Sequence, residues 1–368
     1  MMEKYRNHIL VGIMAFFFFG LSFWCFLKPE EDFSNSERRV LAKKPKLSQE
    51  TIWNGSFMEK FEEYTADQFP IRDSFRSIKA ISALGLFRNK DNNDIYMAEG
   101  YLSKMEYPLQ ENMLDYAAGK MEYLYNTYLK EHAGEIYFTI VPDKNYYLAE
   151  QNGYLALDYQ RLFSYMKEKT EYMKHIDITH LLSLEDYYKT DTHWRQECIV
   201  DVADYIGKEM GTELSASYEK QTLDYPFYGV YCGQSALPVE PDTLYYLTNE
   251  LLEDCKVTSY DTGLPVEKTI YDLEKAYGKD SYDIFLSGAD ALQVIENPAV
   301  KEKKELIVFR DSFGSSLVPL LVEGYSRITV VDIRYINSAM LGHFIDFYGQ
   351  DVLFLYSTMV LNNSLALK

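Results

Sequence analysis

Short apolar runs alternate along the chain with longer stretches in which apolar residues recur at helical intervals. The runs at residues 136–141, 306–309, 328–333 and 352–355 have the length and composition of buried strands. Helical stripes lie before and between these runs, and residues 113–128, which precede the first run, form one of them. Strands that alternate with helices predict an α/β fold built on a doubly wound parallel sheet with right-handed crossovers.

One segment interrupts this alternation. Residues 212–283 are rich in Pro, Gly and Tyr and contain alternating apolar positions such as 243–247. We interpret the segment as a mainly β insertion. Ligands of open α/β sheets bind outside the carboxyl ends of the strands, and an insertion beside that edge is a natural place for substrate specificity.

The N-terminus carries a candidate membrane segment. Residues 9–27 are an uninterrupted run of apolar and small residues, long enough to cross a bilayer as a helix. Lys4 and Arg6 precede the run and acidic residues follow Lys28, so the body is expected outside the cytoplasm. A cleaved signal peptide is the alternative, but no small-x-small site follows. We therefore expect a cell-membrane anchor at residues 1–28, a charged spacer at 29–55 and an extracytoplasmic domain at 56–368.

Ser312 occupies the position typical of a nucleophile, between a predicted strand and a predicted helix. A hydroxyl on such a turn is presented at the edge of the sheet, where backbone N–H groups at the helix start can bind a developing oxyanion. The turn at residues 310–314 does not match the G-x-S-x-G elbow and is closer to the Asp-Ser pair of the GDSL/SGNH esterases. Because Asp-Ser is also a common helix cap, a catalytic partner is needed.

His193 is the partner we expect. An imidazole can act as general base for Ser312 if a carboxylate fixes its tautomer, and Asp191 is available for that role. A spacing of two lets both side chains point the same way from an extended segment, and Trp194 can then exclude water. The alternative is that Asp191 or Thr192 caps a helix and His193 is a surface residue.

Asp177 and His180 are the rival pair. Their spacing of three is the one that ordinary SGNH esterases use. They precede two leucines and resemble the exit from a strand into a loop, so we favour the pair formed by Asp191 and His193.

Three segments give the chain a specific resemblance. Thr-Asp-Thr-His-Trp at residues 190–194, with residues 310–314 and 331–335, resembles the DHHW family. These are bacterial membrane-anchored proteins similar to the SGNH-like acetyltransferases of alginate O-acetylation. Residues 36–45 and 55–72 also resemble the opening of that family.

The resemblance implies roles for individual residues. In those relatives an Asp-x-His-Trp segment precedes the serine, which implies a triad of Asp191, His193 and Ser312. Thr192 stands where the family has its second histidine, and this departure removes no member of the triad.

Polar residues near the predicted strand ends are candidates for binding substrate. Asp143, Lys144 and Asn145 supply either an oxyanion donor or a loop brace, and Arg334 either holds substrate or forms an ion pair with Asp332 or Asp311. The full candidate set is Trp194, Asp143, Lys144, Asn145, Arg310, Asp311, Asp332, Arg334 and Tyr228.

Composition narrows the function classes. A net charge of -19 argues against nucleic-acid binding, which requires a basic surface. The four Cys and six His show no zinc-site spacing, and the glycine motifs that bind phosphate or dinucleotides are absent. We expect no cofactor and no metal site.

The resemblance implies an O-acyltransferase, specifically an O-acetyltransferase, that modifies a polysaccharide or polyol outside the cell. It also implies that a membrane-bound O-acyltransferase delivers the acyl donor. Two other functions remain as alternatives. One is a carbohydrate esterase or deacetylase with the same triad, and the other is a catalytically silent carbohydrate-binding scaffold of cell-envelope assembly.

Overall fold

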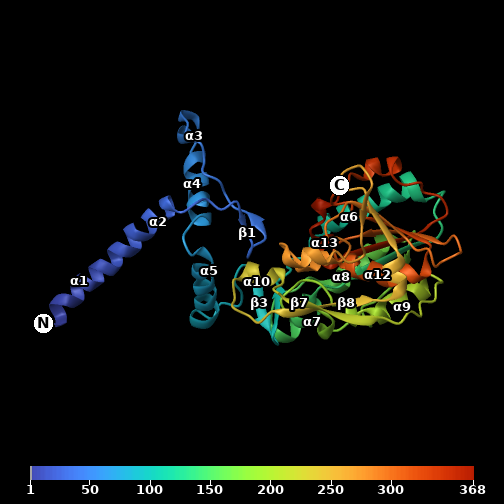
Figure 1. Cartoon of the computed structure of the whole chain (residues 1–368), viewed down its shortest axis with the longest axis horizontal. Helices are drawn as coiled ribbons and strands as arrows, with labels where there is room; N and C mark the ends of the chain where they lie inside the picture. Colours follow the sequence, from blue (N-terminus) through green and yellow to red (C-terminus); the bar gives the residue numbers. More distant parts are fainter. Residues whose placement is uncertain (1) are drawn as a thin grey trace. The chain divides into compact units, whose positions relative to one another are not determined.

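The computed structural model describes residues 2–368 and divides the chain into two compact units. The first consists of Met1–Asn93 with Cys232–Pro238, and the second of Asp94–Tyr231 with Val239–Lys368. Figure 1 follows the chain by colour. Helices α4 (Ser56–Asp67) and α5 (Arg72–Ile81), which the sequence analysis assigned to the main domain, belong to the first unit.

An eight-stranded sheet forms the centre of the second unit, with the strand order β10-β9-β11-β13-β12-β14-β5-β6. Five neighbouring strands, from β13 to β6, run parallel, and Phe309 of β12 pairs with Val331 of β13 and Phe354 of β14. The strands of the sheet are β5 (Ile136–Val141), β6 (Lys174–His175), β9 (Lys256–Ser259), β10 (Val266–Lys268), β11 (Leu292–Glu296), β12 (Glu305–Arg310), β13 (Arg327–Val331) and β14 (Asp351–Ser357).

The sheet is mixed, which corrects the prediction of a wholly parallel one. Strand β11 pairs antiparallel with β13 and with β9, and β10 pairs antiparallel with β9. Strands β9 and β10 come from residues 212–283, so part of the predicted insertion extends the main sheet. Only β7 (Glu219–Phe227) and β8 (Asp242–Thr248) form a separate hairpin there.

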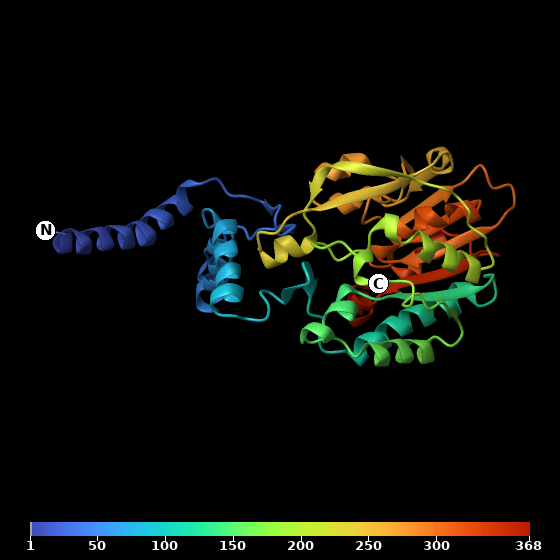
Figure 2. The same cartoon turned by 90° about the horizontal axis from the view of Figure 1, so that it is seen from below.

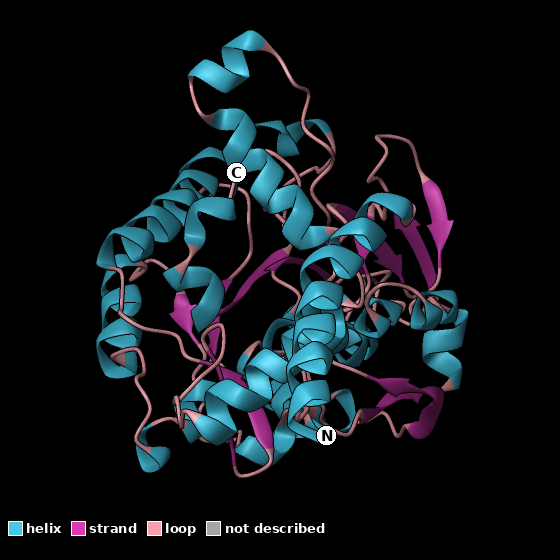
Figure 3. Ribbon diagram, turned by 90° about the vertical axis from the view of Figure 1, so that its left-hand side faces the viewer, coloured by secondary structure: helices cyan, strands magenta, loops and turns pink. Residues whose placement is uncertain are grey.

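Alternating side chains of the central strands pack into two cores, one on each face of the sheet. Leu306 and Val308 join the core formed with α9 (Val200–Glu209) and α12 (Phe313–Leu321). Ile307 and Phe309 join the other core, which contains α6 (Glu111–Leu124) and α8 (Tyr159–Lys169). Helices therefore cover both faces, as Figure 2 and Figure 3 show. The period-two pattern of a strand buried on both faces explains why these runs are continuously apolar.

The first unit begins with the expected apolar helix. Helices α1 (Met2–Ala15) and α2 (Leu21–Leu27) are joined by a π-helical turn, and Tyr5–Cys25 is long and apolar enough to cross a membrane. Its length, composition and place near the N-terminus suit a membrane anchor or a signal sequence.

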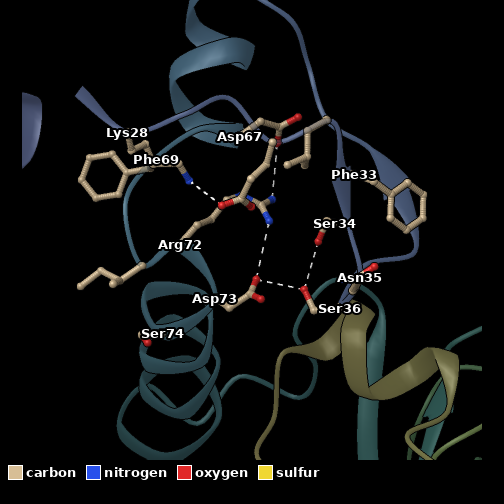
Figure 4. A pocket seen from close by; sticks show the side chains of 13 residues that line it. Lys28, Phe33, Ser34, Asn35, Ser36, Asp67, Phe69, Arg72, Asp73 and Ser74 are labelled. Atoms are coloured by element: carbon tan, nitrogen blue, oxygen red, sulfur yellow. Dashed lines mark hydrogen bonds and ion pairs between the residues drawn. The ribbon is translucent and has the colours of Figure 1, made fainter. Parts of the chain in front are cut away.

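Ion pairs order the segment that was predicted to be a spacer. Strands β1 (Phe33–Ser34) and β2 (Arg39–Val40) pair with each other, and α3 (Gln49–Trp53) follows. Arg39 binds Asp67, while Glu37 binds Arg72. Figure 4 shows the adjoining cavity of about 290 Å³, where Ser36 donates to Asp73 over 3.0 Å. Residues 29–55 are therefore partly folded onto α4 and α5.

Candidate active site

The turn after β12 presents Ser312 in a half-exposed position directly before α12. The buried carboxylate of Asp311 holds the turn: its Oδ1 accepts from the Phe313 N–H over 3.0 Å and its Oδ2 from the Ser357 N–H over 2.7 Å. Gly314 is required because a Cβ there would lie 2.6 Å from the Cβ of Arg310. Asp311 therefore fixes the serine relative to the end of β14 and is not available to a ligand.

Asp191, His193 and Ser312 lie in one chain of hydrogen bonds. The distance from His193 Nδ1 to Asp191 Oδ1 is 2.6 Å, and that from His193 Nε2 to Ser312 Oγ is 2.8 Å. Asp191 and His193 are buried. With the proton on Nδ1, the imidazole donates to the carboxylate and can accept the serine proton at Nε2. The arrangement can therefore support removal of a proton from the Ser312 hydroxyl.

The loop after β7 holds Asp191 in place. The Val230 N–H donates to Asp191 Oδ2 over 2.8 Å, and the Gly229 N–H donates to Thr190 Oγ1 over 2.9 Å. Thr190 in turn donates to Asp242 over 2.6 Å. A Cβ on Gly229 would overlap the backbone of Asp191. Neither Gly229 nor Val230 was identified from the sequence, because both act through contacts with residues about forty positions away.

Tyr282 covers one face of the His193 ring. The two rings are stacked with a centroid separation of 3.8 Å and an interplanar angle of 4°. The Tyr282 hydroxyl shares a hydrogen bond of 2.7 Å with Ser316, which also accepts from Trp194 Nε1 over 2.9 Å. Burial raises the pKa of Tyr282 well above its ordinary value. The sequence analysis missed this residue.

Trp194 lies in the core beside the site. It is fully buried, its ring meets that of Phe313 edge to face at 5.4 Å, and its Nε1 also donates to the Phe313 carbonyl over 3.1 Å. Trp194 thereby ties the segment that carries His193 to the helix that Ser312 precedes.

Thr192 occupies the position of the family's second histidine. Its hydroxyl lies 3.2 Å from Met359 Sδ and accepts from the Tyr231 hydroxyl over 3.2 Å. The hydrogen-bond chain from Asp191 through His193 to Ser312 is complete with threonine at this position.

Asp143, Lys144 and Asn145 act as internal braces. Lys144 Nζ donates to the carbonyls of Tyr188 over 2.8 Å and of Lys189 over 3.2 Å, just before Asp191 in the chain. All three residues are at most 2% exposed. Of the two roles that the sequence left open, the loop brace fits their burial.

The carboxylate of Asp143 is the acceptor at the centre of this brace. It accepts hydrogen bonds from the Thr358 hydroxyl over 2.6 Å and from the Tyr159 hydroxyl over 3.0 Å. Burial raises the pKa of Asp143 to about 6, although these hydrogen bonds oppose the shift.

Arg310, Asp332 and Arg334 form an ion-pair cluster in which Arg310 and Asp332 are buried and Arg334 is half-buried. Arg334 donates to Asp332 from Nε over 2.9 Å and from Nη2 over 2.7 Å. Arg310 is 1% exposed, lies 3.5 Å from the same carboxylate and donates to the Gly288 carbonyl over 3.1 Å. Of the two roles expected for Arg334, the ion pair with Asp332 is the one observed.

The remaining candidates lie elsewhere. Tyr228 is 53% exposed, next to Gly229. Asp177 accepts from the backbone and hydroxyl of Thr179, and His180 packs edge to face on Tyr205. In the described part of the chain, no hydrogen bond joins this rival pair to Ser312, whereas His193 makes one.

Within the described residues, no three His, Cys, Asp or Glu side chains are grouped so that they could hold a metal ion. The site's donors and acceptors are one hydroxyl, one imidazole, one carboxylate and backbone N–H groups. This set suits nucleophilic and acid–base chemistry.

Comparisons with known proteins give the same family as the motifs. Residues 159–331 match the model of the DHHW protein family, so the resemblance is confirmed over this range. No curated protein matches the sequence. A DHHW family protein from Eubacterium siraeum is 20% identical, with a TM-score of 0.59 over 75% of this chain and 95% of its own.

Two further solved structures are similar. Bacillus cereus PatB1, solved with a sulfonyl adduct, is 20% identical, with a TM-score of 0.58 over 73% of this chain and 95% of its own. The O-acetyltransferase domain of Pseudomonas putida AlgJ is 12% identical, with a TM-score of 0.44 over 73% of this chain and 92% of its own. The first two likenesses show the fold.

Proposed function

Starting from the match of residues 159–331 to the DHHW family, we propose that the protein is an extracytoplasmic O-acyltransferase that modifies a polysaccharide. The observation that carries the proposal is the chain of hydrogen bonds from Asp191 through His193 to Ser312. Such a chain activates a hydroxyl that is a weak nucleophile on its own. A scaffold has no need of it, so the catalytically silent alternative is disfavoured.

The first half of the reaction loads the acyl group. Ser312 Oγ attacks the carbonyl carbon of the acyl donor while its proton moves to His193 Nε2. Asp191 keeps the imidazole in the correct tautomer and stabilises the imidazolium. The tetrahedral intermediate collapses, the leaving group takes the proton from His193, and an acyl-Ser312 ester remains.

The second half passes the group to the acceptor. An acceptor hydroxyl gives its proton to His193 as its oxygen attacks the acyl-Ser312 carbonyl. Collapse of that intermediate returns the proton to Ser312 Oγ and releases the new ester. In both halves the negative oxygen needs donors, and the Ser312 N–H makes no hydrogen bond to another described residue. We assign it to the oxyanion site.

The acyl group and acceptor are proposed from the sequence motifs. The Asp-Thr-His-Trp and Arg-Asp-Ser-Phe-Gly segments resemble those of acetyltransferases that modify a polysaccharide, so acetyl is the proposed group. Tyr5–Cys25 would anchor the protein in the cell membrane, where a membrane-bound O-acyltransferase could deliver the acetyl group from the cytoplasm. Buried braces such as Asp143, Lys144 and Arg310 are given no contact with substrate.

An esterase would use the same three residues, and acceptor dependence separates the two activities. The test follows acetyl release from an aryl acetate by the full-length protein in detergent, with and without acetylatable oligosaccharides. Ser312→Ala should abolish release, whereas Ser217→Ala, at an exposed serine of the same unit, should not. Acetyl found on the sugar supports a transferase; equal rates in Ser312→Ala and parent contradict the proposal.

A further inference from the structure

We infer that Tyr282 is a positioning residue for the proposed reaction, which holds the His193 ring in line with Ser312 and stabilises its imidazolium form. The inference rests on the proposed function for its chemistry and on the stacked geometry for its structure. The ring centroids lie 3.8 Å apart and the planes are nearly parallel, at 4°.

The hydrogen bonds of His193 leave its ring able to tilt, and Tyr282 restricts this motion. Imidazole nitrogens direct their hydrogen bonds in the ring plane, so the bonds to Asp191 and Ser312 fix the direction of these nitrogens. They resist tilting of the ring out of that plane only weakly, because both are single contacts at the ring edge. The Tyr282 ring blocks one face, and Phe313 stands at 5.1 Å with its ring tilted by 58°.

Tyr282 is itself anchored to the helix that follows the nucleophile. Its hydroxyl shares a hydrogen bond of 2.7 Å with Ser316 on α12, and its ring packs against Phe285 at 4.9 Å. The residue is 2% exposed. One side chain therefore contacts the proposed base and the helix that begins after the proposed nucleophile, so it sets the distance between them.

The stacked Tyr282 ring also stabilises positive charge on His193. The face of an aromatic ring carries negative potential and attracts a cation, most strongly where water is excluded. His193 becomes positive whenever Ser312 gives up its proton. The charged groups around the stacked pair are Asp191, on the His193 segment, and Asp311 and Arg310, on the turn before α12. The Asp191 carboxylate and the face of the Tyr282 ring both lie beside the charge that then forms on His193.

The test replaces the ring and the hydroxyl separately. Tyr282→Phe keeps the stack and loses the bond to Ser316, and Tyr282→Leu loses the stack. Tyr277→Leu is the control, because Tyr277 belongs to the preceding turn and is 70% exposed. Circular dichroism and thermal unfolding show which variants are folded.

We expect Tyr282→Leu to lower kcat about 10- to 100-fold with little change in KM. Tyr282→Phe should retain most of the parent kcat. The acid limb of the pH–rate profile should move to lower pH by about half to one unit in Tyr282→Leu, because the cation loses its aromatic partner. A merely structural residue would change stability without moving this limb. Parent values in a folded Tyr282→Leu protein would overturn the inference.

A second measurement is independent of turnover. The full chain with labelled histidine is titrated by NMR, and His193→Gln identifies the His193 signals. The midpoint should fall in Tyr282→Leu and stay near that of the parent in Tyr282→Phe. If Tyr282→Leu does not fold, Tyr282→pentafluorophenylalanine reverses the ring's electrostatic face at similar shape and should lower the midpoint relative to Tyr282→Phe. An unmoved midpoint overturns the inference even if the protein is inactive on the chosen ester.

Discussion

The backbone N–H of Val230 donates a hydrogen bond of 2.8 Å to Oδ2 of Asp191, the oxygen that does not face His193. Oδ2 therefore accepts from the loop after β7, while Oδ1 accepts from the imidazole and from the backbone N–H of His193. The carboxylate accepts these bonds best when it is ionised. The loop between β7 and β8 thus contributes to the site by orienting a side chain that lies far away in the sequence.

Gly229→Ala should damage the site from this loop. A Cβ at position 229 would overlap the Asp191 backbone, so either the loop or the residues around Asp191 must move. We expect a loss of about 1–3 kcal/mol in the free energy of unfolding and a large loss of kcat. Chemical unfolding and aryl-ester kinetics measure the two effects. Gly119→Ala, in an open position within α6, is the control: it should leave kcat unchanged and raise the free energy of unfolding by about 0.5–1 kcal/mol, because alanine favours the helix.

Asp191→Asn removes the negative charge of the Asp191 side chain but keeps its shape. The amide has nearly the same shape, but it cannot hold the imidazole in the tautomer that leaves Nε2 free for Ser312. We expect kcat to fall about 10⁴-fold with the fold preserved. Asp177→Asn, in the rival pair, is the matched control and should retain parent activity. The assignment of Asp191 fails if Asp177→Asn is the inactive variant of the two.

Asp143 makes stability depend on pH. Burial raises its pKa to about 6 in the folded protein, whereas an unfolded aspartate titrates near about 4. The folded state therefore binds more protons than the unfolded state between these pH values. The stabilisation that the protonated Asp143 carboxyl provides is fully present below about pH 4 and is lost as the pH rises through about 6. The free energy of unfolding of Asp143→Asn should therefore rise relative to that of the parent by up to about 3 kcal/mol between pH 4 and pH 7.

Urea unfolding of parent and Asp143→Asn at several pH values measures this difference. Asp224→Asn, at an exposed carboxylate, is the control and should show a constant difference from the parent. A constant difference for Asp143→Asn as well, or one of opposite slope, would contradict the assignment of a raised pKa.

Local sequence patterns contained much of the fold and of the candidate site. The run at residues 136–141 coincides with β5, because a strand buried on both faces must be continuously apolar. Asp191, His193 and Ser312 could be proposed from the sequence because each belongs to a short motif. Strand direction was not predictable, since the alternation in β9 and β11 is the same for either orientation.

The sequence could not reveal what other side chains bring to the site. Tyr282 and Val230 have no local motif, and they reach His193 and Asp191 only because the chain folds back on itself. The polar residues Asp143 and Lys144 follow a strand, as ligand-binding residues do, yet they are buried braces. Their position was predictable, but their exposure depends on the packing of distant segments.

Trapping of the acyl group tests the central claim most directly. The full-length protein is mixed with an aryl acetate, quenched in acid and digested, and the acetylated peptide is located by mass spectrometry. The acetyl group should be on Ser312, absent in Ser312→Ala, and formed much more slowly in His193→Ala. Acetylation elsewhere at a similar rate in parent and Ser312→Ala would contradict the account, because the hydroxyl 2.8 Å from His193 would then not be the nucleophile.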